Sequence, residues 1–319
     1  MKKFLKYNIL VLSVLTVFAK AQETVPYYHQ YLLGGEYLFN PSYFGTIDDV
    51  VVNGFYQKQF SKLSEGPSIQ SLGIHANVVD RVGAGAYFFR DQNGPISSNG
   101  LAVGASYFIP IGDDDSRTDA FSFGAGVNFY NMNVDWSQIN AKDPNDPYLQ
   151  DGSNSIFIAY INLGMQFSYQ SFFGELSAVN IPLTNKRSIV NGIEQSPTRY
   201  FLHTGYEYAL DEGFSVQPSV MFNLDTNSSR MTDLNFIAKV SDDRNYFAGG
   251  LSYRIAKTPF GSQQLSLSPL IKAEFNRLTF GAVYNFSMSK LSNFGGNSFM
   301  LSLGYNFENF INSRGFRYR

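Results

Sequence analysis

The stretch DAFSFGAGVNFYNM, residues Asp119–Met132, alternates large apolar side chains with small or polar ones. Phe123 and Phe129 lie at odd positions, whereas Ser122 and Asn128 lie at even positions. Successive side chains of an extended strand point to opposite faces. The stretch therefore predicts a strand with one apolar face and one face that carries only glycine, serine and asparagine.

The same alternation recurs along the chain and predicts about fourteen strands, most of them close to the roughly 9–11 residues that a tilted membrane strand needs. The predicted strands cover residues 51–59, 69–78, 82–90, 98–110, 118–130, 156–168, 171–179, 198–208, 214–224, 231–240, 245–255, 264–275, 278–289 and 298–307.

The connections between these strands are generally long and short in turn, as when longer extracellular loops alternate with short periplasmic turns. Only the turn over residues 112–118 departs from this rule. An even number of strands places both ends at the periplasm and lets the sheet close without free edges. We therefore predict an all-β fold, a transmembrane antiparallel β-barrel over residues 51–307. Its strand at 118–130 directs Phe121 to Phe129 to lipid and Ser122, Gly124, Gly126 and Asn128 to the lumen.

Composition agrees with a membrane barrel. Aromatic and charged residues each make up 16% of the chain, whereas a soluble domain carries roughly 25% charged residues. A soluble β-sandwich is the alternative, but its strands rarely need Phe and Tyr so uniformly on one face. The net charge of −2 argues against a nucleic-acid partner. The absence of cysteine excludes disulfides and thiolate metal sites.

The two ends of the chain lie outside the predicted barrel. Residues 1–21 combine two lysines, a short apolar run and an Ala-Lys-Ala site, which predicts a cleaved signal peptide. A signal-anchor helix would need about twice as long an apolar run. Residues 22–50 are too aromatic for a disordered linker, so we expect them to form a plug or a periplasmic element. Residues 308–319 form a C-terminal tail.

Motifs for chemistry are sparse. The histidines His29, His75 and His203 show no spacing that marks a catalytic triad, which is in any case recognised by geometry. We expect them to face the lumen or the membrane interface. The acidic loop within residues 131–155 lacks the calcium-loop pattern. The sequence therefore predicts no enzymatic activity, no metal and no cofactor.

The segment QYLLGGEYLFNPSYFGT, residues 30–46, resembles the N-terminal signature of the PorP/SprF family, in which Asn-Pro-Ala-Tyr-Ala-Gly follows a Gln-Tyr start. The matching positions are Asn40, Pro41, Tyr43 and Gly45, while serine and phenylalanine replace the two alanines. Further blocks, FYQKQFSKLSEGPSIQSLGIH, VGAGAYFFRDQNGPIS and FAGGLSYR, follow in the family's usual order. The C-terminal stretch VYNFSMSKLSNFGGNSFMLSLGYNF departs from the family's closing pattern.

The resemblance implies a bacterial outer-membrane barrel of the type IX secretion and gliding-motility apparatus of Bacteroidota-like bacteria. Its implied partners are the type IX translocon or other apparatus proteins, a secreted cell-surface adhesin, and outer-membrane lipid. The candidate residues for partner binding or for a plug are Tyr31, Asn40, Pro41, Tyr43 and Gly45. The two long loops, 131–155 and 180–197, supply candidate extracellular contacts, namely Trp136, Asp143, Asp146, Tyr148, Lys186 and Arg187.

Two other functions stay open at this point. A plugged transport barrel for small hydrophobic ligands, like a fatty-acid channel, would also have about fourteen strands, and the N-terminal segment is apolar enough for it. An outer-membrane hydrolase would have only His75 and His203 as bases within the barrel. Ligand uptake into liposomes would test the first alternative, and replacement of both histidines by glutamine would test the second.

Overall fold

The computed structural model describes residues 29–63, 66–111, 119–135, 155–183, 196–227, 229–242, 245–258, 261–289 and 292–312. The predicted signal peptide and the six loop residues singled out above, Trp136, Asp143, Asp146, Tyr148, Lys186 and Arg187, lie outside these ranges. Among the described residues, no helix is both long and apolar enough to cross a membrane.

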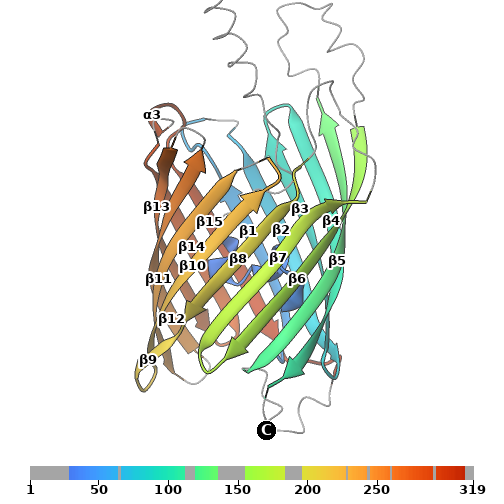
Figure 1. The fold of residues 1–319 in the computed structure, drawn as a ribbon, viewed down its shortest axis with the longest axis vertical. Helices are drawn as coiled ribbons and strands as arrows, with labels where there is room; N and C mark the ends of the chain where they lie inside the picture. The colour runs from blue at the N-terminus through green and yellow to red at the C-terminus, as the bar shows by residue number, and fades with distance from the viewer. Residues whose placement is uncertain are drawn as a thin grey trace, which may run out of the picture.

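The wall of the molecule is one antiparallel sheet (Figure 1). Its strands are β1 Val50–Lys58, β2 Ser68–Val79, β3 Val82–Asn93, β4 Ile96–Pro110, β5 Ala120–Val134, β6 Ser155–Tyr169, β7 Phe172–Pro182, β8 Arg199–Tyr206, β9 Tyr208–Asp211, β10 Phe214–Asp225, β11 Arg230–Asp242, β12 Asn245–Thr258, β13 Gly261–Phe275, β14 Leu278–Ser287 and β15 Ser298–Phe307.

The sheet closes into a barrel. Strand β1 pairs with β15, with Val50 opposite Phe307, and β10 pairs with β11. Strands β8 and β9 both pair with β10 and act as one strand interrupted at Glu207, so the wall has the 14 strands that the alternation predicts. Closure leaves no unpaired edge, as the lipid environment requires. The barrel is therefore confirmed, and the β-sandwich is not the fold.

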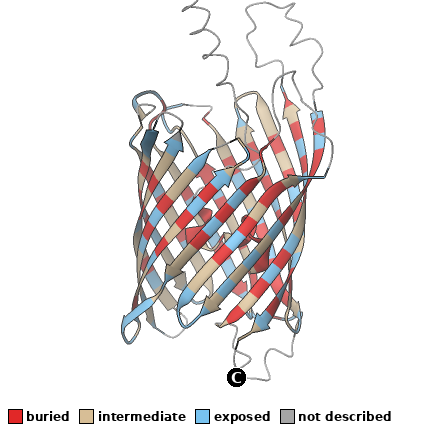
Figure 2. Cartoon of the chain, viewed as in Figure 1, coloured by how far each residue is buried: buried red, intermediate tan, exposed pale blue. Residues whose placement is uncertain are grey.

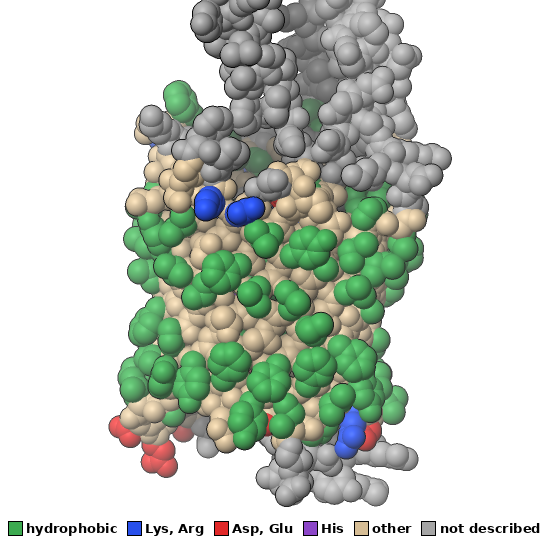
Figure 3. Space-filling view, in the orientation of Figure 1, with side chains coloured by type: hydrophobic (Ala, Val, Ile, Leu, Met, Phe, Trp, Pro, Cys, Tyr) green, Lys and Arg blue, Asp and Glu red, His purple; other side chains and the backbone are tan. Residues whose placement is uncertain are grey.

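The two faces of the wall differ as predicted. In β5, Phe123 and Phe129 are exposed on the outside, whereas Ser122 and Asn128 are buried inside the barrel. Buried and exposed residues alternate along the strands in Figure 2, and in Figure 3 apolar side chains cover the visible wall while charged side chains gather at its two ends. An apolar belt of this kind is the surface that a transmembrane barrel presents to lipid.

The turns identify the two ends of the barrel. At the lower end in Figure 1, β6–β7 and β13–β14 are joined by two-residue turns. Gln170 and Ser171 both have positive φ, as do Asn276 and Arg277, which is the type I′ geometry that matches the twist of a hairpin. Because short turns lie at the periplasmic side, this end, where the C-terminal tail also leaves, is the periplasmic end.

The connections within the hairpins β3–β4 and β12–β13 are each shorter than predicted by five residues or more. The strands were expected to stop at residues 90 and 255, but β3 and β4 continue to a turn at 94–95, and β12 extends to residue 258. The apolar alternation ends there because the strands leave the membrane. Backbone pairing does not end, since Asp91 still pairs with Ser98.

The C-terminal tail folds under the periplasmic rim as far as it is described. The side chain of Asn309 donates to the carbonyl oxygen of Asn77 in β2 at 2.9 Å, and that of Asn312 donates to the Asn77 side-chain oxygen at 2.5 Å. Between them, Phe310 and Ile311 are exposed. The tail therefore presents two apolar side chains outside the lipid-facing wall.

Candidate functional site

The N-terminal residues fill the interior of the barrel. Residues 29–45, called the lumenal segment below, form three short 3-10 helices, η1 Gln30–Leu33, η2 Glu36–Leu38 and η3 Pro41–Tyr43, visible inside the wall in Figure 1. Gly34 ends η1 with φ of 87°, a left-handed conformation that favours glycine. The segment contributes no strand to the wall.

The Asn-Pro pair starts η3 by ordinary helix-capping chemistry. The Asn40 side chain accepts a hydrogen bond from the Ser42 N–H at 3.1 Å, and Pro41 occupies the first helical position, where its missing N–H has no cost. The same side chain donates to the carbonyl oxygen of Met165 and to Oε2 of Glu175, both at 3.3 Å. Asn40 thus holds the local turn and joins it to β6 and β7.

Glycines on the inner face of the wall make room for η3. A Cβ atom added to Gly124 would overlap the Pro41 carbonyl group, and one added to Gly164 would overlap the Asn40 side-chain oxygen. The small residues between the phenylalanines of β5 therefore do more than leave space in a lumen. They let the backbone of the lumenal segment lie directly against the backbone of the wall.

The next residues use glycines of β3 and β4 in the same way. The Phe44 ring lies against Gly85 and Gly104, and a Cβ at Gly83 would overlap the Phe44 carbonyl oxygen. The Ser106 hydroxyl donates to that oxygen at 2.5 Å. We call these positions, together with the two beneath η3, the lumenal glycines: Gly83, Gly85, Gly104, Gly124 and Gly164.

Gly45 closes the lumenal segment against β2. Its N–H donates to Nδ1 of His75 at 3.2 Å, and its φ of 63° is one that glycine adopts without strain. A Cβ there would also overlap the Ala76 carbonyl oxygen. The glycine of the Asn-Pro signature is therefore required both by its conformation and by the close approach of β2.

A buried ion pair binds the other end of the segment. Arg254 donates from Nε and Nη2 to the two carboxylate oxygens of Asp233, both at 2.7 Å, and the Tyr31 hydroxyl donates to Oδ2 of Asp233 at 3.0 Å. Asp233 and Arg254 are 3% and 6% exposed. Two-pronged pairing of this kind fixes geometry as well as charge. Tyr31 is thereby tied to β11 and β12.

A second buried pair lies beneath Asn40. Nδ1 of His203 and Oε1 of Glu175 are 2.5 Å apart, and the His203 ring packs edge-on against Tyr31 and Phe173 with centroids 5.0 Å apart in each case. The remaining carboxylate oxygen of Glu175 receives the Asn40 amide. The pair therefore connects η3, η1 and the wall.

The histidines occupy positions that hold the segment in place. His203 pairs with Glu175, His75 accepts from Gly45, and His29 lies 3.1 Å from the Ser252 hydroxyl. His29 and Ser252 are both 0% exposed, so a substrate has no access to that serine. Lumen-facing histidines are what the sequence suggested.

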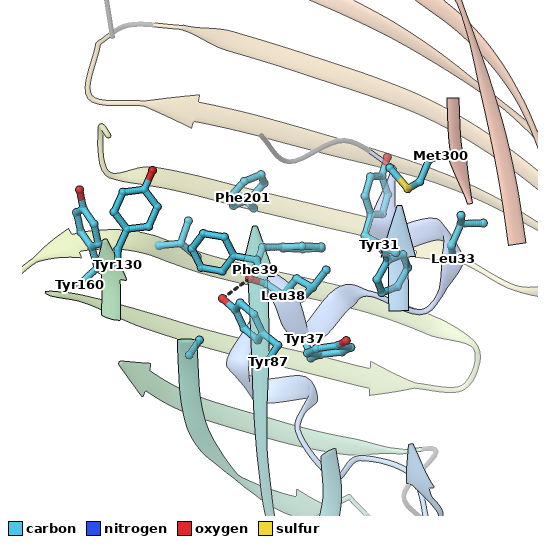
Figure 4. Close-up of a cluster of buried hydrophobic side chains, with 14 of the residues drawn as sticks. Tyr31, Leu33, Tyr37, Leu38, Phe39, Tyr87, Tyr130, Tyr160, Phe201 and Met300 are labelled. Atoms are coloured by element: carbon cyan, nitrogen blue, oxygen red, sulfur yellow. Dashed lines mark hydrogen bonds between the residues drawn. The ribbon is translucent and has the colours of Figure 1, made fainter. Parts of the chain in front are cut away.

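An aromatic cluster fills the lumen beside the segment (Figure 4). The Tyr87 hydroxyl donates to the Leu38 carbonyl oxygen at 3.0 Å, and Phe39 packs on Phe201 with ring centroids 5.2 Å apart. Tyr130 is fully buried and continues the even-numbered, inward register of β5. Sequence reasoning missed these inward aromatics, although extending the alternation past Phe129 would have found Tyr130.

One carboxyl group of the segment lies close to a lysine of the wall. Burial raises the pKa of the Glu36 carboxyl to about 6, against the opposing effect of the positive charge on Lys272. At neutral pH, burial of the ionised Glu36 carboxylate in the lumen therefore lowers the stability of the folded barrel.

The structure brings the five predicted N-terminal residues together inside the barrel. Tyr31, Asn40, Pro41 and Gly45 are buried and Tyr43 is half-buried. These residues lie inside the wall, and both a plug role and partner binding through them stay predictions. Among the described residues, no group of three or more His, Cys, Asp or Glu side chains could hold a metal ion.

Solved structures resemble the chain in fold. The Ralstonia pickettii toluene transporter TbuX is 10% identical, with 92% of this chain and 99% of that chain covered and a TM-score of 0.50. A deltaS2 mutant of the TodX monoaromatic hydrocarbon channel is also 10% identical, with coverage of 82% and 89% and a TM-score of 0.46. At such low identity the TbuX likeness shows the barrel fold alone.

Sequence comparison is more specific. No curated protein matches the chain at a significant level. The profile of the type IX secretion system membrane protein PorP/SprF, in contrast, matches residues 20–305, which include the lumenal segment and almost all of the wall. The chain therefore belongs to the PorP/SprF family of type IX secretion system membrane proteins and is an outer-membrane β-barrel.

Proposed function

We propose that this barrel serves type IX secretion and gliding motility as a binding component, which holds the translocon or another apparatus protein, or a secreted surface adhesin. The observation that carries the proposal is the lumenal segment. It lies across the barrel interior and contacts β4, β5 and β6 through backbone-to-glycine packing, and β11 and β12 through a buried ion pair. A barrel filled in this way is suited to binding partners at its ends more than to conducting them.

The periplasmic end offers a surface for an apparatus protein. In the described turns, terminal strand residues and segments flanking β1 and β15 there, acidic side chains outnumber basic ones. The acidic residues are Asp48, Asp49, Asp80, Asp119, Asp211, Glu212, Asp242 and Glu308, and the basic residues are Arg81 and Arg277. Phe310 and Ile311 project beside this rim, 75% and 48% exposed. A partner with a basic surface around an apolar recess would complement both features. An adhesin would instead be bound by the loops 131–155 and 180–197, which lie mostly outside the described residues.

The test is mild detergent extraction of the tagged barrel from its native outer membrane, followed by mass spectrometry of the bound proteins. We expect a type IX apparatus protein or a secreted adhesin to remain bound. Recovery of the barrel alone, or with lipid only, would argue against the proposal.

Variants locate the contact. Replacing Phe310 and Ile311 together by alanine is expected to reduce recovery of an apparatus protein while the barrel stays in the membrane. The matched control is Phe275→Ala, because Phe275 is 70% exposed at the same end but belongs to the wall strand β13. Equal loss in both variants would show a general effect on the barrel instead of a contact made by the tail.

The alternative of transport of small hydrophobic ligands requires an apolar path through the lumen. Such a path would have to pass the lumenal segment, which contacts β4, β5 and β6 on one side and is hydrogen-bonded to Asp233 of β11 on the other; this arrangement supports the binding proposal over transport. Uptake of a fatty acid or an aromatic hydrocarbon by liposomes that contain the purified barrel, but not by empty liposomes, would reverse this preference.

A further inference from the structure

A cavity of about 220 Å³ lies inside the barrel near the extracellular rim. Its walls come from β11 to β15, and its rim includes Gln59 and Phe60, which follow β1, and Asn297, which precedes β15. Arg254 lines it and reaches from there to the Asp233 carboxylate and so to Tyr31 of the lumenal segment. The cavity is separate from the contacts of η3 with the lumenal glycines.

The rim of this cavity is held in a defined shape. The N–H groups of Ser61 and Lys62 donate to the carbonyl oxygens of Asn297 and Gly295 at 2.8 Å and 3.1 Å. Phe60 adopts a φ of 50°, which is uncommon for a bulky residue and persists only where the surroundings enforce it. The two loops are thus fixed to each other, and the Phe60 ring is placed at the mouth of the cavity.

The chemistry of the lining is neutral and rich in hydrogen-bonding groups. Hydroxyl and amide side chains of Gln59, Ser266, Asn285 and Ser298 line the cavity. Among the described residues that line the cavity, Arg254 carries the charge, and its two-pronged pairing with Asp233 compensates it. Lys62 lies beside Gly296 at the rim. Apolar surface, from residues that include Phe60, Met231 and Leu265, makes up the larger part of the accessible lining. This lining suits a ligand with hydroxyl groups and an apolar face.

We propose that the cavity binds one unit of a neutral saccharide. A hexose ring presents hydroxyl groups at its edge and C–H groups on its faces, which match the polar lining and the Phe60 ring. The volume lies below the roughly 300 Å³ at which pockets for larger ligands begin, so one ring enters and the remainder of a glycan stays outside. An extended peptide would need a free strand edge, and the closed wall has none among the described strands.

The experiment is saturation-transfer NMR on the purified full chain with methyl glucoside, methyl galactoside and methyl mannoside, each followed by titration. The protein is kept in an amine-oxide detergent, because maltoside detergents carry sugar head groups. We expect saturable binding of at least one of the three pyranosides. Saturable binding of a tripeptide without binding of any pyranoside would overturn the proposal.

Two variants and a control locate the site. Ser298→Leu fills the cavity and should abolish binding, while Gln59→Ala removes one hydrogen-bonding group and should weaken binding roughly fivefold. Ser262→Leu serves as the control, since Ser262 is exposed at the same end of the barrel and outside the cavity. Heat-dependent migration on gels reports whether each variant remains folded. Unchanged binding in folded Ser298→Leu, or no binding of any neutral pyranoside to the parent, would show that the proposal is wrong.

Discussion

The lumenal glycine at position 124 allows a direct test of how the segment is held. In Gly124→Ala the new Cβ would lie 2.5 Å from the Ser42 nitrogen and closer to the Pro41 carbonyl, where non-bonded carbon contacts are normally about 3.5–4.0 Å. Because these neighbours are backbone atoms, the segment or β5 must shift by about 1 Å. Overpacking of this kind costs roughly 1–3 kcal/mol. We expect the cost to fall on the docking of the segment, since β5 is paired on both sides.

Cysteine labelling measures that docking. The chain has no cysteine, so Ser42→Cys introduces a single thiol at a position that is 0% exposed. A maleimide reaches this thiol only when the segment leaves its site, and the labelling rate then follows the population of the opened state. A penalty of 1–3 kcal/mol raises the rate roughly 5- to 150-fold in the Gly124→Ala background.

Gly126→Ala is the matched control, because Gly126 lies on the same strand and the same face. Its nearest atom is the Val103 carbonyl oxygen at 3.0 Å, and no atom of the lumenal segment is among its three nearest neighbours. Labelling should stay within about twofold of the parent. Equal acceleration by the two alanines, or no acceleration by Gly124→Ala, would refute the reasoning.

Three further predictions concern charge and lipid. Asp233→Ala leaves the Arg254 charge buried and should lower the free energy of unfolding by about 3–5 kcal/mol. Lys239→Ala removes one partner of a half-exposed ion pair and should lower the free energy of unfolding by less than about 1 kcal/mol. Urea titration followed by heat-dependent gel migration compares the two variants, and equal losses would contradict the burial argument. Folding raises the pKa of the Glu36 carboxyl from 4.5 to about 6, so the folded barrel favours the neutral form. This contribution to the free energy of unfolding is fully present below pH 4.5 and is lost as the pH rises through 6. Glu36→Gln should therefore stabilise the barrel by about 2 kcal/mol at pH 7.5, and a similar gain at pH 4 would disprove this cause. Phe123→Arg, on the exposed face of β5, should cost roughly 2–4 kcal/mol in refolding into lipid bilayers, and an unchanged refolding equilibrium would place this residue outside the bilayer.

The wall could be predicted because its information is local. Alternation in stretches such as Phe121 to Phe129 shows which face of the sheet each residue occupies, and this does not depend on which strands lie next to it. The fourteen predicted segments all correspond to strands of the wall. The errors concern strand ends, as at residues 91–97. There the side chains become polar on both faces once the strand leaves lipid, so the alternation no longer reports the backbone pairing.

The lumen could be predicted only in part, because its contacts join residues far apart in the chain. The aromatic N-terminal residues indicated a segment that packs somewhere, but nothing in the sequence places Asn40 on Gly164 or Tyr31 beside Asp233. The glycines of β5 were assigned to the correct face for an incomplete reason. Glycine at alternate positions indicates only that no side chain is present on the inner face. That pattern is equally compatible with an open lumen and with a second backbone packed against the wall.

The lumenal glycines also have a mechanical consequence. Gly85 faces Gly104 across β3 and β4, and Gly124 faces Gly164 across β5 and β6. Such pairs lack the cross-strand side-chain contacts that normally stabilise neighbouring strands. On this side of the barrel, contacts with the lumenal segment replace those side-chain contacts. The stiffness of the wall there therefore depends on a segment that lies inside the barrel and precedes all of its strands in the chain.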